Sequence, residues 1–108
     1  MSTFNDFIST LKNDLLDFAK ENLEEYKDEL LKDGTMFIEK TKSDLERWTE
    51  GLASGALSKS DFEFLLKGKK DLAEMEALKQ LGLSKIRISK ITNGIIDVIA
   101  GSAIKTFL

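Results

Sequence analysis

The only side chains in this sequence that are grouped closely enough to suggest acid–base chemistry are carboxylates. Four of them recur at steps of three and four residues: Glu21, Glu24, Glu25 and Asp28. Paired carboxylates serve as acid and base where burial separates their pKa values. Lysines at positions 20 and 27 alternate with this group, a pattern typical of a solvated helix face.

The other residues that could support catalysis are missing or have a simpler role. The sequence contains no His and no Cys, which removes the most common general base, the usual zinc ligands and the thiolate nucleophile. Ser58 beside Lys59 could be read as a Ser–Lys dyad. A capping box with Asp61 explains the same serine more simply. We therefore expect no enzymatic activity, no metal and no cofactor.

Positive charge is concentrated in the second half of the chain. Residues 1–50 hold 7 Lys or Arg against 13 Asp or Glu, and residues 51–108 hold 9 against 6. Two basic clusters stand out, at 67–70 and 85–90. No aromatic residues are interleaved with them as in a nucleic-acid surface, and the net charge is −3, so the sequence argues against a nucleic-acid partner. We expect the acidic and basic halves to pack together, with an anion-binding basic face as the alternative.

Apolar residues in the first half recur at the helical period of three and four. We prefer one long helix from Thr3 to about Glu50, with a slip of phase near 19–23. Gly34 lies on the apolar stripe between Leu30 and Phe37. It either permits another helix to approach closely or forms a turn with Asp33.

The glycines at 51 and 55 end this helix. Ser58 then predicts the N-cap of a second helix from about Lys59 to Gln80. Gly82 is typical of a helix C-terminus, and Ser84 of the next N-cap. The third helix is expected from Lys85 to about Thr106 and should be the most buried of the three.

These helices predict an all-α single domain over residues 1–108. A 48-residue helix would be about 70 Å long, so the two shorter helices can fold back along it as an elongated antiparallel bundle. That arrangement places Phe4, Phe7 and Ile8 beside Ile104, Phe107 and Leu108. If Gly34 is a turn, the alternative is a compact four-helix bundle. If Gly82 only kinks the chain, a two-helix hairpin results.

The stretch from Gly94 to Leu108 combines Gly-Ile-Ile-Asp-Val-Ile with small residues, Lys105 and Phe107. It resembles the short amphipathic membrane-active peptides of the aurein and citropin kind, although it carries only one lysine. The resemblance covers about 15 residues and implies binding at a membrane surface. A buried core or oligomer helix is the alternative interpretation of the same segment.

We expect a non-enzymatic helical protein that self-associates, as a homo-oligomer, or binds a helical protein partner through its amphipathic faces. A lipid- or membrane-surface protein is the alternative function. The opening residues do not form a secretory signal, so we expect a cytoplasmic location. The candidate interaction residues are Leu45, Trp48, Phe62, Phe64, Ile95, Ile99 and Phe107.

Overall fold

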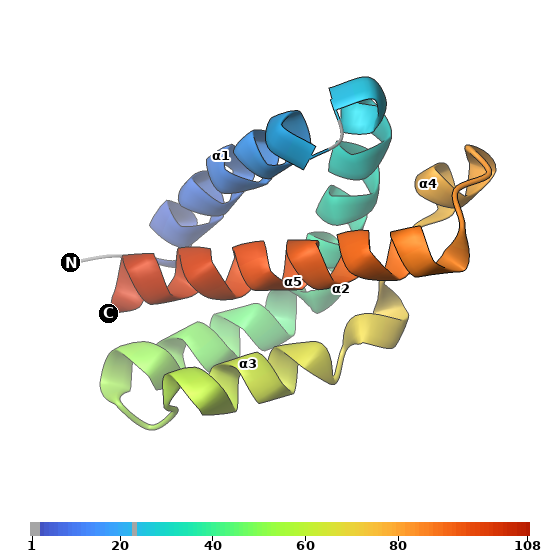
Figure 1. Cartoon of the computed structure of the whole chain (residues 1–108). Helices are drawn as coiled ribbons and strands as arrows, with labels where there is room; N and C mark the ends of the chain where they lie inside the picture. The colour runs from blue at the N-terminus through green and yellow to red at the C-terminus, as the bar shows by residue number, and fades with distance from the viewer. Residues whose placement is uncertain (1–2, 23) are drawn as a thin grey trace.

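The computed structural model describes residues 3–22 and 24–108. Within them the chain forms five α-helices, two 3-10 turns and no strand, so the predicted all-α class is confirmed. In chain order the elements are α1 (Phe4–Asn22), η1 (Glu24–Tyr26), α2 (Lys27–Ser54), α3 (Lys59–Lys67), η2 (Lys70–Leu72), α4 (Glu76–Gln80) and α5 (Lys85–Phe107). Figure 1 shows their arrangement.

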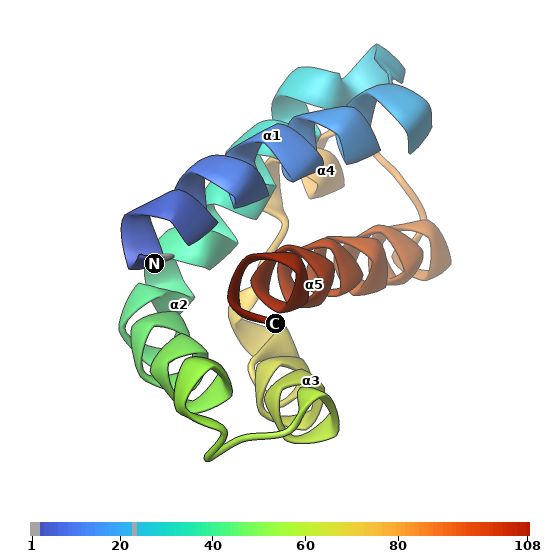
Figure 2. The ribbon, with the colours of Figure 1, turned by 90° about the vertical axis from the view of Figure 1, so that its left-hand side faces the viewer.

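Helix α5 lies at the centre of the molecule, and α1, α2 and α3 pack around it (Figure 2). Eight of its residues are buried, including Ile95 and Ile99, which have no exposed surface. The helix begins at the predicted residue, where the Ser84 hydroxyl accepts a hydrogen bond from Arg87 N at 3.2 Å. The predicted third helix and its N-cap are therefore confirmed.

The prediction of one helix from Thr3 to Glu50 is wrong. Helix α1 ends at Asn22, and α2 begins at Lys27 after the 3-10 turn η1. The phase slip near 19–23, interpreted as the drift of one straight helix, instead coincides with the end of α1; Leu23 itself lies outside the described residues. A helix of about 70 Å would exceed the longest dimension of the molecule, which measures 42 × 24 × 19 Å. Folding α1 back against α2 and α5 buries its apolar side, including Leu11 and Leu15.

Gly34 lies inside α2, so the alternative of a turn at this glycine is also wrong. A Cβ atom at position 34 would stand 2.9 Å from Leu15 Cδ2 on α1. Since real Cβ contacts are essentially never that short, the glycine permits the close approach of α1 and α2. The close-approach interpretation of Gly34 is confirmed.

The second predicted helix, from Lys59 to Gln80, starts correctly and ends too late. Ser58 and Asp61 form the predicted capping box, with hydrogen bonds of 3.1 Å in both directions. Helix α3 nevertheless stops at Lys67, and the chain passes through η2 and the left-handed residue Met75 (φ 54°) before α4. This detour buries Met75 and Leu78 in the core. The left-handed Gly82 (φ 78°) then separates α4 from α5 as predicted.

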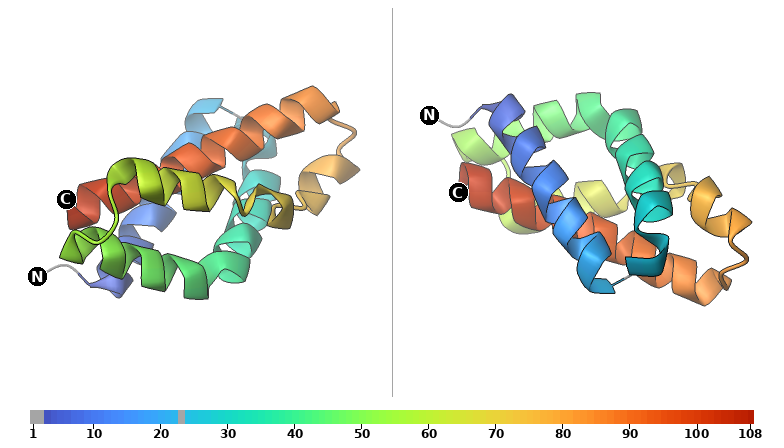
Figure 3. Two further views of the ribbon diagram at one scale, coloured as in Figure 1. Left: turned by 90° about the horizontal axis from the view of Figure 1, so that it is seen from below. Right: turned by 90° about the horizontal axis from the view of Figure 1, so that it is seen from above.

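Helix α2 bends in its middle, so its two halves run in different directions (Figure 3). Thr41 stands at the middle of the residue range of α2 and is buried, and its hydroxyl donates to Phe37 O at 2.9 Å. A threonine that bonds back to the preceding turn often bends a helix. The first half of α2 can therefore lie near α4, while the second half pairs with α3.

Packing between the acidic and basic halves follows the expectation from charge. Three of the four ion pairs in the described part of the chain join the two halves. In two of them, Lys69–Asp44 and Lys105–Asp14, the carboxylate belongs to the acidic half as expected, and in Lys40–Glu74 the sense is reversed. The predicted meeting of the chain ends is also confirmed, because the rings of Phe7 and Phe107 lie 5.9 Å apart. The radius of gyration is 13.6 Å, near the roughly 13 Å expected for a compact chain of this length.

Candidate functional site

Most of the predicted interaction residues lie inside the molecule. Four of them have no exposed surface: Leu45, Phe62, Ile95 and Ile99. Trp48 and Phe107 are half-buried and pack against the core. The Trp48 and Phe62 rings meet edge to face at 6.4 Å, in the manner of a core anchor. A partner could contact the four buried residues only if the bundle opened.

Phe64 differs from the other candidates because it is 77% exposed on α3. Two other large apolar side chains are equally open, Ile86 at 72% and Leu108 at 64%. These two lie at opposite ends of α5. The amphipathic stripes seen in the sequence are therefore largely used within the chain, and the three most exposed apolar side chains lie on different parts of the surface.

The residues first considered for acid–base chemistry lie on the surface. Glu21, Glu24, Glu25 and Asp28 are all exposed. The described residues hold no group of three or more carboxylates placed to bind a metal ion. Ser58 is occupied as the N-cap of α3, which satisfies its hydroxyl without a Ser–Lys dyad.

Asp14 on α1 is the centre of a polar contact with the C-terminal part of α5. Its carboxylate accepts a hydrogen bond from Ser102 Oγ at 2.6 Å and lies 2.9 Å from Lys105 Nζ. Partial burial raises the pKa of Asp14. The Ser102 and Lys105 hydrogen bonds and the Lys105 charge outweigh it, so the pKa is lowered overall. This contact joins α1 to α5 beside the ring contact of Phe7 and Phe107.

Asp33 is buried in α2 and caps a different helix. Its two carboxylate oxygens accept hydrogen bonds from Ala77 N at 3.0 Å and Leu78 N at 2.8 Å, near the start of α4. The first amides of a helix have no partner within the helix, and an anionic acceptor there is favoured by the helix dipole. Since α4 has only five residues, we attribute much of its placement to this carboxylate.

The positions of α4 and η2 create a groove along the first half of α5. Its volume is about 540 Å³. Half-buried apolar side chains from three segments form its floor: Ala73, Leu83 and Ile88. The other lining residues are polar or charged: Lys70, Asp71, Glu74, Lys79, Lys85, Ser89 and Thr92. We call this feature the α4–α5 groove. Its size and its apolar floor with a polar rim are typical of binding sites.

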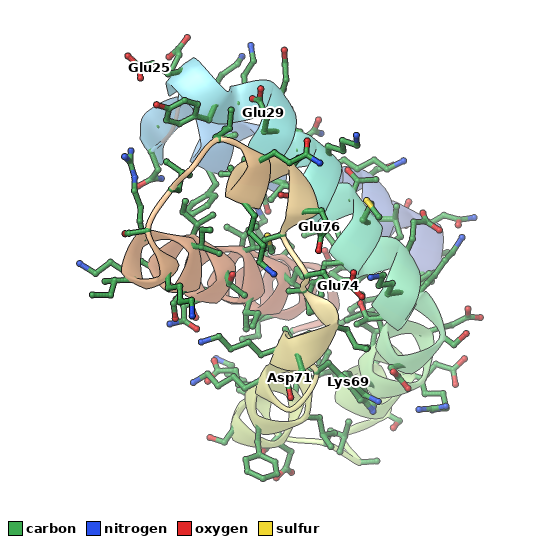
Figure 4. The ribbon with its side chains drawn as sticks, turned by 90° about the vertical axis from the view of Figure 1, so that its right-hand side faces the viewer. Glu25, Glu29, Lys69, Asp71, Glu74 and Glu76 are labelled. Carbon is green, nitrogen blue, oxygen red and sulfur yellow. The ribbon has the colours of Figure 1, made fainter. Side chains whose placement is uncertain are left out.

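The charges around the α4–α5 groove are not balanced. Lys70 Nζ donates to Ser89 Oγ at 3.2 Å, and Glu74 pairs with Lys40 of α2 at 3.0 Å. Lys79 and Lys85 form no ion pair with any residue that the structure describes. Figure 4 looks onto this end of the molecule, where Asp71, Glu74 and Glu76 follow the chain from η2 to α4.

Sequence reasoning found the two basic clusters but not the groove that they share. Lys70 comes from the cluster at 67–70 and Lys85 from the cluster at 85–90. The detour at η2 and α4, which the sequence pattern did not predict, brings them to one site. Arg87 of the second cluster instead lies over the Tyr26 ring at 5.8 Å.

Comparison with known proteins found no matching protein-family model, no matching curated protein and no matching solved structure. Among the helices of residues 3–22 and 24–108, none has the length and apolar character needed to cross a membrane.

Proposed function

We propose that this chain is a non-enzymatic, cytoplasmic helical interaction domain that binds a helical segment of a partner protein in the α4–α5 groove. The observation that carries the proposal is the groove itself, whose apolar floor of Ala73, Leu83 and Ile88 packs against the core and is still partly exposed. Two or three apolar side chains from one face of a helix would occupy a volume of this size, as in helix-in-groove recognition.

The shape of the groove favours a protein segment over a small molecule. Small-molecule sites bury most of the ligand surface, whereas this groove is broad and open to solvent along one side. Its two carboxylates, Asp71 and Glu74, lie on the exposed rim. They lack the burial that would tune a carboxylate pair for catalysis.

Partner binding is better supported than self-association. The long apolar stripes on which we based a homo-oligomer are buried within one chain. The most exposed apolar residues, Phe64, Ile86 and Leu108, lie on α3 and at the two ends of α5. Stable dimers need a contiguous patch. A light-scattering mass of one chain across a wide concentration range is the expected result.

The test is an unbiased selection of helical peptides from a displayed library against the immobilised protein. We expect the selected peptides to lose about tenfold or more in affinity for Ala73→Phe, which fills the groove without changing the charge. Ala53→Phe, an exposed site on α2, is the matched control and should bind like the wild type. Circular dichroism checks that both variants fold. Peptides that bind Ala73→Phe and the wild type equally would refute the proposal.

A membrane surface remains the alternative function, resting on the resemblance of the segment from Gly94 to Leu108. In the folded chain this segment contributes Ile95, Ile96 and Ile99 to the core, so lipid binding would require α5 to separate from α1 and α3. Flotation with neutral and anionic liposomes distinguishes the two functions. Flotation that Ala73→Phe, the variant with the filled groove, retains in full would favour the membrane.

A further inference from the structure

The unpaired charge of the α4–α5 groove lies at the turn between the two helices. Lys79 is in the last turn of α4, and Lys85 is the first residue of α5. Both side chains are exposed, and neither has a carboxylate within ion-pair distance in the described part of the chain. At the other end of the groove, Asp71 accompanies Lys70, and Glu74 is neutralised by Lys40. One end is thus cationic and the other is mixed.

The start of α5 adds to the positive potential of this end. Its first turn contains no acidic residue and carries Lys85 and Arg87. Cations near a helix N-terminus are unfavourable because they face the positive end of the helix dipole. Helix α3 differs in this respect, because its first turn carries the capping carboxylate of Asp61. An anionic group bound at the turn would offset both the lysine charges and the dipole.

Resting on the proposed function, we infer that the groove takes an amphipathic helix with carboxylates clustered at one end of its apolar face. The apolar side chains of that helix contact Ala73, Leu83 and Ile88. Its carboxylates lie against Lys79, Lys85 and the first turn of α5. At the mixed end, Lys40 and Lys70 offset Glu74 and Asp71, so this end does not attract a second acidic group and the cationic end sets the direction in which the helix binds.

The experiment uses the full chain and three synthetic helical peptides of about 16 residues. All three share one apolar face and differ only in three flanking positions at one end, which are Glu, Gln or Lys. Fluorescence anisotropy gives the Kd of each peptide. The Glu peptide should bind about tenfold more tightly than the Lys peptide, with the Gln peptide between them. The advantage of the Glu peptide should shrink as salt is raised, because these charges are exposed to solvent.

The matched variants locate the effect. Lys79→Gln with Lys85→Gln should remove most of the advantage of the Glu peptide. Lys42→Gln with Lys59→Gln removes the same charge from exposed positions on α2 and α3 and should leave the advantage intact. A peptide with the Glu cluster moved to its other end should bind about as weakly as the Gln peptide.

The outcomes separate this inference from the proposed function. One outcome is that the three peptides bind the wild type with equal affinity and fail to bind Ala73→Phe. That result would overturn the inference that the bound helix carries a carboxylate cluster, and it would leave the groove as the binding site. If the peptides selected from the library also bind Ala73→Phe with the same affinity as the wild type, the proposed function fails as well. Anionic vesicles that bind through Lys79 and Lys85, without preference among the peptides, would overturn the inference in favour of lipid headgroups.

Discussion

The Asp33 carboxylate in α2 accepts a hydrogen bond of 2.8 Å from the backbone amide of Leu78 in α4. The two residues are 45 positions apart in the sequence, and both are buried. This contact orients the short helix that forms one wall of the α4–α5 groove. The groove therefore depends on a carboxylate that is not part of its lining.

Asp33→Ala should lower the free energy of unfolding by about 1–3 kcal/mol, because it leaves two amides of α4 without their acceptor. Hydrogen exchange should show loss of protection at Ala77 and Leu78 before any loss in α5. Glu39→Ala, at an exposed position in the interior of α2, is the control and should change stability by less than about 0.5 kcal/mol. Unchanged protection in α4 would contradict the role of Asp33.

Gly94→Ala should destabilise the protein although alanine is the better helix former. A Cβ atom at position 94 would lie 2.4 Å from Phe18 Cζ, so the ring must move, and we expect a loss of about 1–3 kcal/mol. Gly101 lies in the same helix with nothing within 4 Å of its would-be Cβ. Gly101→Ala should therefore stabilise by about 0.5–1 kcal/mol.

Chemical denaturation of the two alanine variants measures both effects. In a Phe18→Ala background, Gly94→Ala should no longer destabilise, because the smaller side chain at position 18 removes the clash; the double-mutant cycle therefore isolates the contact between the two positions. A stabilising Gly94→Ala would show that α1 and α5 are not packed at this point.

The stability of the α1–α5 contact should depend on pH through Asp14. The pKa of this carboxyl is lowered in the folded state, so ionised Asp14 adds stability above its unfolded pKa of about 3.9. That contribution is lost as the pH falls through the lower folded pKa. The difference in unfolding free energy between wild type and Asp14→Asn should shrink when the pH is lowered from 7 to about 3. Asn13→Ala, exposed on the same helix, replaces a side chain that does not titrate and serves as the control.

Lys85→Glu should have opposite effects on stability and binding. A carboxylate at the first residue of α5 suits the helix dipole, so the free energy of unfolding should rise by about 0.3–1 kcal/mol. The same change removes a cation from the groove and should lower the affinity of the protein for the Glu peptide. Thermal unfolding and peptide titration of one preparation test both effects. A destabilised Lys85→Glu would indicate that Lys85 has a structural role instead.

The parts of the fold that could be predicted are those with local signals. Ser58 and Ser84 cap helices through hydrogen bonds to residues three positions away. Gly82 adopts the left-handed conformation that glycine permits most easily. Helix α5 has an apolar side long enough to be recognised from its period alone. Gly34 was correctly placed on an interhelical contact because it interrupts an apolar stripe.

The parts that could not be predicted depend on contacts between distant residues. Helix α4 is capped by Asp33 from another helix, and Met75 adopts a left-handed conformation that its residue type does not indicate. The groove follows from these two features, so Lys70 and Lys85 were seen only as members of separate basic clusters, and Lys79 was not singled out. The seven candidate interaction residues were chosen for their apolar character, and that same character places most of them in the core.

The most direct test of the account is a map of backbone amide shifts in ¹⁵N-labelled protein titrated with the Glu peptide. We predict that the perturbed amides cluster at 70–74, 79 and 83–92, which border the α4–α5 groove. The amides around Phe64 and those in the C-terminal half of α5 should stay unchanged. Shifts confined to α3, or spread along the core face of α5 as in an opened bundle, would contradict binding in the α4–α5 groove.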